Sequence, residues 1–182
     1  TSLEAAKRLR CKFIALLSDV VDSQGIPIPP DPPISEITKL TSYYECISQA
    51  LEMAEKAGVT ILLEPLNTRV DHPGYYLAYS QQGFEIIRAL NHPRLKMMFD
   101  IYHLQVMEGN ITQTIESNLE HIGHIHVADV PGRHEPGTGE LNFHNIARML
   151  ETSGYDGHVG LECFPIGDSD EAIRIFADIF GS

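Results

Sequence analysis

The sequence has no tryptophan, only three cysteines and no long uninterrupted apolar run. Its cysteines, Cys11, Cys46 and Cys163, are odd in number, widely spaced and outside any Cys-x-x-Cys pair. This pattern argues against a disulfide framework and against a thiolate zinc site, and it favours a reducing, cytoplasmic compartment. Because no stretch approaches the roughly 18 apolar residues of a membrane-spanning helix, we expect no transmembrane segment.

Basic side chains are also scarce. The 182 residues include 13 Lys and Arg against 25 Asp and Glu, which gives a formal net charge of −12. An acidic surface repels phosphate backbones and anionic lipids, so we expect a small-molecule substrate, with no nucleic acid and no membrane among the partners. With 43% hydrophobic residues the chain can bury a substantial core, and we expect a single domain over residues 1–182.

Five short apolar runs alternate with segments of helical periodicity. The runs predict strands over residues 12–17, 59–64, 95–100, 122–127 and 158–162. Helices are predicted over residues 35–57, 80–90, 103–119, 143–152 and 170–180, with a break at Gly109-Asn110 in the third. Gly58 and Gly154 follow two of these helices where glycine commonly ends a helix, and Asn142 is a suitable N-cap. This regular alternation is typical of a parallel α/β sheet.

Polar residues occur where four of the apolar runs end. They are Glu64, Asp100, His126 and Glu162, each about one strand–helix unit from the next. In a parallel α/β barrel the carboxyl ends of the strands converge on one face, so these side chains are expected to meet there. Three carboxylates and an imidazole cannot share a small site without a cation, because repulsion would force protonation. Mostly oxygen ligands favour Mn²⁺, Mg²⁺ or Co²⁺, with Zn²⁺ as a further option. The alternative for each residue alone is a helix cap or a solvated loop.

Four longer stretches carry a family resemblance. They are residues 62–67, 99–109, 122–140 and 154–162. Through them the chain, from about residue 12 to its end, resembles the xylose-isomerase-like barrel superfamily, and most closely its hydroxypyruvate isomerase branch. The resemblance implies an α/β fold, a (β/α)₈ TIM barrel that here lacks the first three βα units, with residues 12–17 as the fourth strand. A complete barrel typically needs roughly 250 residues. The first ten residues also resemble the end of a helix and lack an initiator Met, so we expect the natural N-terminus upstream.

The resemblance also implies functional roles. The implied metal ligands are Glu64, Asp100, His126 and Glu162. Glu64 and Glu162 would in addition be the catalytic proton-transfer pair, and His103 and Arg133 would contact substrate oxygens. The implied activity is a metal-dependent isomerase that interconverts a small hydroxy-aldehyde and a keto acid, or a sugar, by enediolate proton transfer.

Three other interpretations stay open. His126 stands where some hydroxypyruvate isomerases have Gln and ketose 3-epimerases usually have His, so a ketose 3-epimerase is one alternative. Asp100-x-x-His103 and Arg133-His134 are similar to the zinc-binding pattern of apurinic-site endonucleases, although Gly132 stands where those enzymes need an aspartate. The third is a non-catalytic barrel fragment, whose two open sheet edges would favour pairing with another copy in a homo-oligomer.

Several further polar residues have ordinary structural interpretations. His124 shares a strand face with His126 by alternation and is expected to be a buried, hydrogen-bonded core histidine. His134 and Glu135 are expected to be solvated loop residues, with a substrate role as the alternative. Asn67 either steadies the loop after Glu64 or forms a turn. The Gly137-Thr-Gly139 segment favours a plain turn over a phosphate site. Ordinary positions are expected for His72, His92, His121, His144 and His158.

Overall fold

Five parallel strands form one sheet in the order β1-β2-β3-β4-β5, in a computed structural model that describes residues 1–181. The strands are β1 Phe13–Leu16, β2 Thr60–Leu63, β3 Leu95–Asp100, β4 Ile122–Val127 and β5 His158–Leu161. Sequence neighbours are also spatial neighbours, as the curled sheet of a half-barrel requires. The five predicted strands and the α/β class are confirmed.

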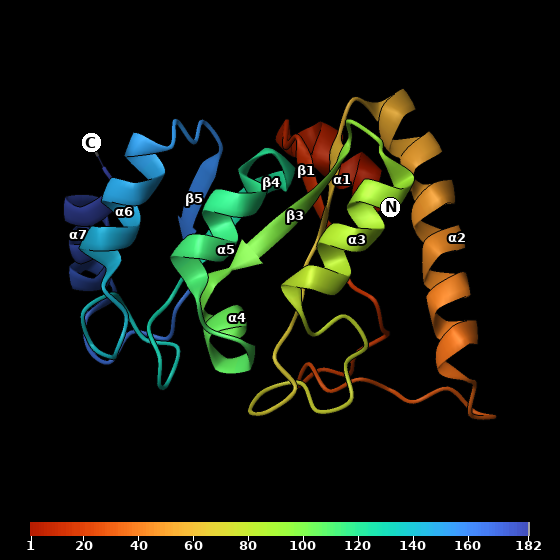
Figure 1. The fold of residues 1–182 in the computed structure, drawn as a ribbon, viewed down its shortest axis with the longest axis horizontal. Coiled ribbons are helices and arrows are strands. Elements are labelled where there is room, and N and C mark those ends of the chain that lie inside the picture. Colours follow the sequence, from red (N-terminus) through yellow and green to blue (C-terminus); the bar gives the residue numbers. More distant parts are fainter. Residues whose placement is uncertain (182) are drawn as a thin grey trace.

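Helices cover one side of the sheet, and the loops that follow the strands gather along the lower edge in Figure 1. The helices are α1 Ser2–Leu9, α2 Glu36–Ala57, α3 Ser80–Leu90, α4 Ile101–Met107, α5 Ile111–Asn118, α6 Phe143–Thr152 and α7 Ser169–Phe180, with a 3₁₀ turn η1 at Leu119–His121. Gly109 and Asn110 have left-handed φ angles of 67° and 53°, which produces the predicted break between α4 and α5. The start of α4 precedes the prediction by two residues, because the Asp100 side chain accepts from the His103 N–H and caps the helix.

Local signals in the sequence account for the helix ends. Ser35 caps α2 by accepting from the Thr38 N–H, and Gly58 ends this helix with a φ of 70°. Asn142 caps α6 through the Asn145 N–H, as predicted. These caps are therefore supplied by residues next to the helices, without help from distant parts of the chain.

Alternation along the strands divides the sheet into two faces. Ile61, Met97 and Ile125 face the helices and are almost completely buried. Gly83 lets α3 pack closely against the sheet, since a Cβ at this position would lie 2.6 Å from Met97 Cε. The opposite, concave face carries Leu62 and other residues of the same parity, and four of these side chains end at the site described below.

His124 lies on the concave face next to His126, with 4.8 Å between the ring centroids. It also stacks on His158 at 6.1 Å. The prediction of a buried, hydrogen-bonded core residue was wrong: His124 is only half-buried, and its side chain makes no hydrogen bond within residues 1–181. The physical reason is that the concave face of the five-stranded sheet is open around His124. The His124 side chain lines a cavity there together with Phe13.

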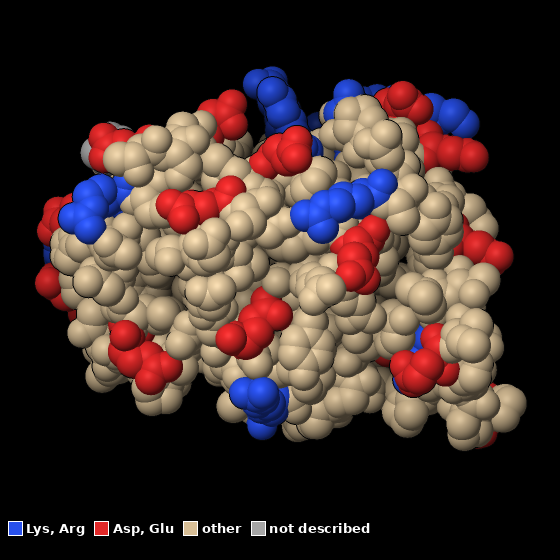
Figure 2. All heavy atoms as spheres, in the orientation of Figure 1, with Lys and Arg blue, Asp and Glu red and all other residues tan. Residues whose placement is uncertain are grey.

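The surface agrees with the composition. In Figure 2, acidic and basic side chains are interspersed on the visible face, without a continuous basic patch. Cys11, Cys46 and Cys163 are free thiols. Within the described part of the chain, no helix combines the length and apolar character needed to cross a bilayer.

Candidate metal centre

The structure brings the four predicted ligands together. Glu64 directly follows β2 and Glu162 directly follows β5. Asp100 is the last residue of β3, and His126 is the second-last residue of β4. Each has the parity of the concave face, and the register pairs Asp100 with His126 across two neighbouring strands. One potential ligand atom from each residue lies within 4.8 Å of the others. Their role as metal ligands remains a prediction that this geometry permits.

His126 Nδ1 is at the centre of the cluster. It lies 2.9 Å from Glu162 Oε2, 3.7 Å from Glu64 Oε1 and 3.9 Å from Asp100 Oδ2. Despite these short distances, this buried nitrogen has no well-directed hydrogen bond within residues 1–181. A buried polar atom without a partner demands an explanation. A nitrogen that lies close to three carboxylate oxygens without a well-directed hydrogen bond to any of them fits a divalent cation, and so does this set of donors.

Electrostatics within the cluster follow from burial and close opposite charges. Burial raises the pKa of Asp100 to about 7, although the Arg133 charge opposes the rise. The contact with His126 lowers the pKa of Glu162 to about 2. Burial alone would lower the pKa of His126, but the Glu162 and Glu64 carboxylates outweigh it and raise the pKa to about 10. Without a metal, a proton on His126 therefore balances part of the negative charge.

We expect metal binding to release protons, because a coordinating imidazole must be neutral and a coordinating carboxylate ionised. Below the pKa of His126, about 10, the apparent affinity for Mn²⁺ should rise by up to about tenfold per pH unit for each proton released. Calorimetric titration in two buffers of different ionisation enthalpy measures the number of protons. An observed heat that is independent of the buffer would contradict this expectation.

Arg133 and His103, the two predicted substrate contacts, border the cluster. Arg133 Nη2 donates to Glu162 Oε2 at 2.7 Å and to Asp100 Oδ2 at 3.1 Å. Its guanidinium lies over the ring of Tyr102, 5.2 Å from the centroid. His103 is 1% exposed, and its Nε2 is 3.8 Å from Asp100 Oδ2. Burial, with a smaller contribution from the Arg133 charge, lowers the pKa of His103 to about 2, so the ring is neutral.

Asp129 is a buried residue that sequence reasoning missed. Its carboxylate accepts backbone N–H groups from Val130, Gly137, Gly139 and Leu141. These bonds shape the loop that carries Arg133. A Cβ on Gly139 would lie 2.1 Å from the Val130 carbonyl oxygen, so this close approach requires glycine. The N–H groups of Gly137 and Gly139 thus bind Asp129, which agrees with the prediction of a plain turn over a phosphate site. The sequence signal was an aspartate just beyond a strand end, followed by closely spaced glycines.

His134 and Glu135 tie the same loop to the segment after β5. His134 Nδ1 lies 2.6 Å from the Phe164 carbonyl oxygen, and Glu135 Oε2 accepts from the Ile166 N–H at 3.0 Å. Glu135 is buried, not solvated as expected, because this backbone partner compensates its burial. His134 lies outside the four-residue cluster. The second histidine of the endonuclease-like pattern is therefore engaged in loop packing.

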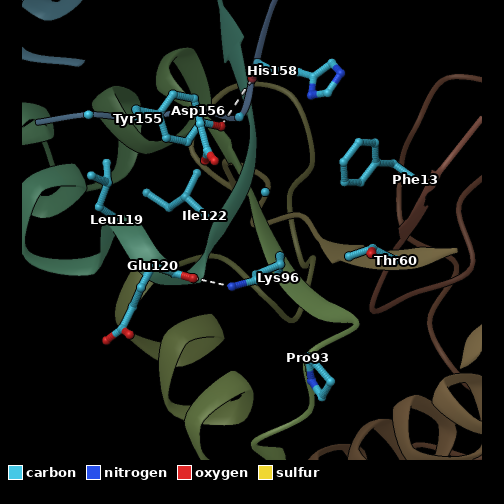
Figure 3. Close-up of a pocket in the computed structure, with 13 residues that line it drawn as sticks. Phe13, Thr60, Pro93, Lys96, Leu119, Glu120, Ile122, Tyr155, Asp156 and His158 are labelled. Atoms are coloured by element: carbon cyan, nitrogen blue, oxygen red, sulfur yellow. Dashed lines mark hydrogen bonds between the residues drawn. The ribbon is translucent and has the colours of Figure 1, made fainter. Parts of the chain in front are cut away.

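A cavity of about 580 Å³ lies near the opposite, amino-terminal ends of the strands. Figure 3 shows Phe13, Lys96 and His158 around it. Two of its polar groups already have partners, since Lys96 Nζ donates to the Glu120 carbonyl and the Tyr155 hydroxyl to the His158 carbonyl. This cavity contains none of the four clustered residues, and the chemistry is expected at the carboxyl ends instead.

Comparison with known proteins decides the family. The family model described as Xylose isomerase-like TIM barrel matches residues 1–179. The chain belongs to this family. The resemblance inferred from four sequence stretches is thereby confirmed, and the concave cluster occupies the strand ends at which barrels of this kind carry their functional groups.

Two curated relatives are isomerases by name. The 2-oxo-tetronate isomerase of Cupriavidus necator is 42% identical over 124 residues, which are 68% of this chain and 47% of that protein. The hydroxypyruvate isomerase of Escherichia coli K12 is 38% identical over 130 residues, covering 71% and 50%. The chain thus spans about half the length of these relatives. Among solved structures, an AP endonuclease, family 2, from Brucella melitensis superposes with a TM-score of 0.85 at 30% identity, covering 97% of this chain and 64% of that one.

Proposed function

We propose that this chain forms part of a metal-dependent isomerase of the hydroxypyruvate isomerase type. Such an enzyme interconverts a small hydroxy-aldehyde and a keto acid through an enediolate. One observation carries the proposal: three carboxylates and an imidazole from four neighbouring strands converge within 4.8 Å. The names of the relatives from Cupriavidus necator and Escherichia coli supply the reaction class.

Glu64, Asp100, His126 and Glu162 would hold the ion, with Mn²⁺, Mg²⁺ or Co²⁺ favoured by the oxygen-rich set and Zn²⁺ as an alternative. When bound, a divalent ion supplies a Lewis acid that stabilises negative charge on substrate oxygens. Asp100 is 1% exposed, so its position is determined by the protein and not by solvent.

Glu64 and Glu162 would move the proton. In the reaction, a proton leaves the carbon that bears the hydroxyl group and is returned to the neighbouring carbonyl carbon, while the hydroxyl proton passes to the former carbonyl oxygen. The two glutamates follow β2 and β5, the outer two of the four strands that supply the cluster. One carboxylate takes the proton, and the same group or its partner returns it. Carboxylates are weak bases, so positioning close to the reacting carbon must supply much of the rate.

Arg133 would recognise a carboxylate on the substrate. Its guanidinium has five donors in a planar fork that suits a carboxylate, and two of its bonds already go to carboxylate oxygens. A keto acid offers a carboxylate to the Arg133 guanidinium, whereas a neutral sugar has none. This preference supports a hydroxypyruvate-like substrate over a ketohexose.

Arg133→Gln is expected to raise the KM for hydroxypyruvate by about 10- to 100-fold, because a charged hydrogen bond contributes roughly 1.5–3 kcal/mol. The KM for a neutral ketose should change much less. Steady-state kinetics with both substrates at saturating metal measures the difference. Since Arg133 also contacts Asp100 and Glu162, metal affinity is measured in parallel as the control. An equal rise in both KM values would argue against carboxylate recognition.

The proposal is tested by metal analysis coupled to a substrate panel of hydroxypyruvate, 2-oxo-tetronates and ketohexoses. Metal-dependent turnover of the keto acids supports it. Preference for ketohexoses with inversion at carbon 3 would instead support the ketose 3-epimerase, which the presence of His126 favours. Nicking of abasic DNA with zinc would support an endonuclease, the activity in the name of the Brucella melitensis protein. Metal binding without turnover of any substrate would support a non-catalytic barrel fragment.

The net charge and the free thiols bear on the partners and the cellular compartment of the proposed enzyme. A formal charge of −12 disfavours nucleic acid, and the substrates named for the relatives are small molecules. Three free cysteines suit a reducing, cytoplasmic compartment. For the barrel-fragment alternative, the edges at β1 and β5 are suited to pairing with another copy, and sedimentation velocity measures such a homo-oligomer.

A further inference from the structure

Asn67, in the loop after β2, has hydrogen bonds that fix the direction of its amide. Its Oδ1 accepts from the backbone N–H groups of Val70 and Asp71, at 3.0 Å each. Its Nδ2 donates to Asp71 Oδ2 at 2.6 Å. The reversed amide would turn its oxygen toward the Asp71 carboxylate and its NH₂ toward two N–H donors. Only one orientation therefore satisfies these partners.

That orientation determines where His103 carries its proton. The Asn67 backbone N–H donates to His103 Nδ1 at 3.2 Å, and Asn67 Nδ2 is 2.8 Å from the same nitrogen. Two donors directed at Nδ1 require it to accept, so the proton of the ring is on Nε2. Nε2 lies 3.8 Å from Asp100 Oδ2, on the side of the candidate metal centre.

The surroundings hold this pair rigidly. Asn67 is 0% and His103 is 1% exposed. The His103 N–H donates to Asp100 Oδ1 at 3.0 Å, which ties the start of α4 to a predicted ligand. On the other side, the Asn67 carbonyl accepts from the His72 N–H, and the His72 ring bonds the Gly25 carbonyl oxygen at 2.7 Å. His72, expected to be an ordinary loop residue, thus joins the loop after β1 to this network.

We propose that Asn67 is a positioning residue that holds His103 in the Nε2–H tautomer, so that His103 presents a hydrogen-bond donor to a substrate oxygen at the metal centre. The inference rests on the proposed isomerase function. It restricts the group that His103 contacts to an oxygen with a free lone pair, such as a carbonyl or enediolate oxygen. A donor already oriented by buried partners requires no reorganisation as negative charge develops on that oxygen.

Reversing the donor tests the proposal. In the double variant Asn67→Asp/Asp71→Asn, the new amide at position 71 can donate to the new carboxylate at position 67, so the bond within the loop persists with its direction reversed. The side-chain group that faces His103 Nδ1 at 2.8 Å then changes from a donor to an acceptor, while the backbone N–H at 3.2 Å, the longer of the two contacts, remains. Asp71→Asn alone is the matched control, because Asn67 still faces the ring.

Two-dimensional ¹H–¹⁵N spectra that correlate the ring protons with both imidazole nitrogens report the tautomer, and His103→Gln identifies the signals. In the wild type and in Asp71→Asn we expect an unprotonated Nδ1 at neutral pH. In the double variant we expect a protonated Nδ1. A wild-type Nδ1–H tautomer overturns the proposal by itself, and so does an unchanged pattern in a double variant that melts like the wild type.

Kinetics test the positioning role separately. With Mg²⁺ and hydroxypyruvate, the double variant should lower kcat by about 10²-fold, the order of magnitude for one misplaced donor at a developing oxyanion, with a smaller change in KM. A changed tautomer with normal kcat overturns the role. A wild type that turns over no substrate of the panel but shows the expected tautomer overturns the proposed function, not the contact between Asn67 and His103.

Discussion

Glu64→Gln and Glu162→Gln should each lower the kcat of isomerisation by about 10²- to 10⁴-fold, the range in which a positioned acid or base contributes. Glutamine keeps the shape and one carbonyl oxygen, but it cannot take up a proton. The two substitutions therefore remove proton transfer while disturbing the cluster less than truncation would. Turnover of hydroxypyruvate at saturating Mn²⁺, with incorporation of solvent deuterium into the product, measures the effect.

Glu151→Gln is the matched control, since Glu151 is exposed on α6 and outside the cluster. It should leave turnover unchanged. Metal affinity of the two test variants is determined in the same buffer, so that a lost ion is not mistaken for a lost base. Near-normal turnover in either Glu64→Gln or Glu162→Gln would exclude that residue from the proton transfer.

Mn²⁺ should raise the melting temperature of the wild-type protein, and His126→Ala or Asp100→Asn should remove most of that rise. A ligand at about 100 times its Kd stabilises the folded state by roughly 2.7 kcal/mol. For a chain of this size that corresponds to about 5–10 °C, at roughly 2–4 °C per kcal/mol. His126→Ala removes one of the four converging ligand atoms, and Asp100→Asn removes the negative charge of another ligand. Differential scanning calorimetry with Mn²⁺ and with EDTA compares the two states.

His144→Ala serves as the control, because His144 is exposed on α6 and outside the cluster. Its response to Mn²⁺ should equal that of the wild type. Asp100→Asn is informative in EDTA as well, since burial already raises the pKa of this carboxyl to about 7. Neutralising it should therefore cost little stability without metal. An undiminished Mn²⁺ response in both test variants would show that the ion binds elsewhere.

Local patterns in the sequence predict the units of the fold and the residues of the candidate metal centre. Apolar runs of strand length, separated by helical periodicity, specify parallel strands because both faces of such a sheet are covered or enclosed. Alternation along a strand then settles which side chains share a face. Glu64, Asp100, His126 and Glu162 stand at or near the carboxyl ends of their strands, which predicted that they converge on one face of the barrel.

The loop contacts that complete the site could not be predicted in this way. Asp129 collects four N–H groups, Arg133 bonds Asp100 and Glu162, and Asn67 orients His103. Each of these contacts depends on the path of an irregular segment, and no periodicity encodes such a path. The partial exposure of His124 also depends on the open concave face and not on its own strand. Regular structure follows from local repetition, whereas polar partners in loops are selected by the packing of segments distant in the chain.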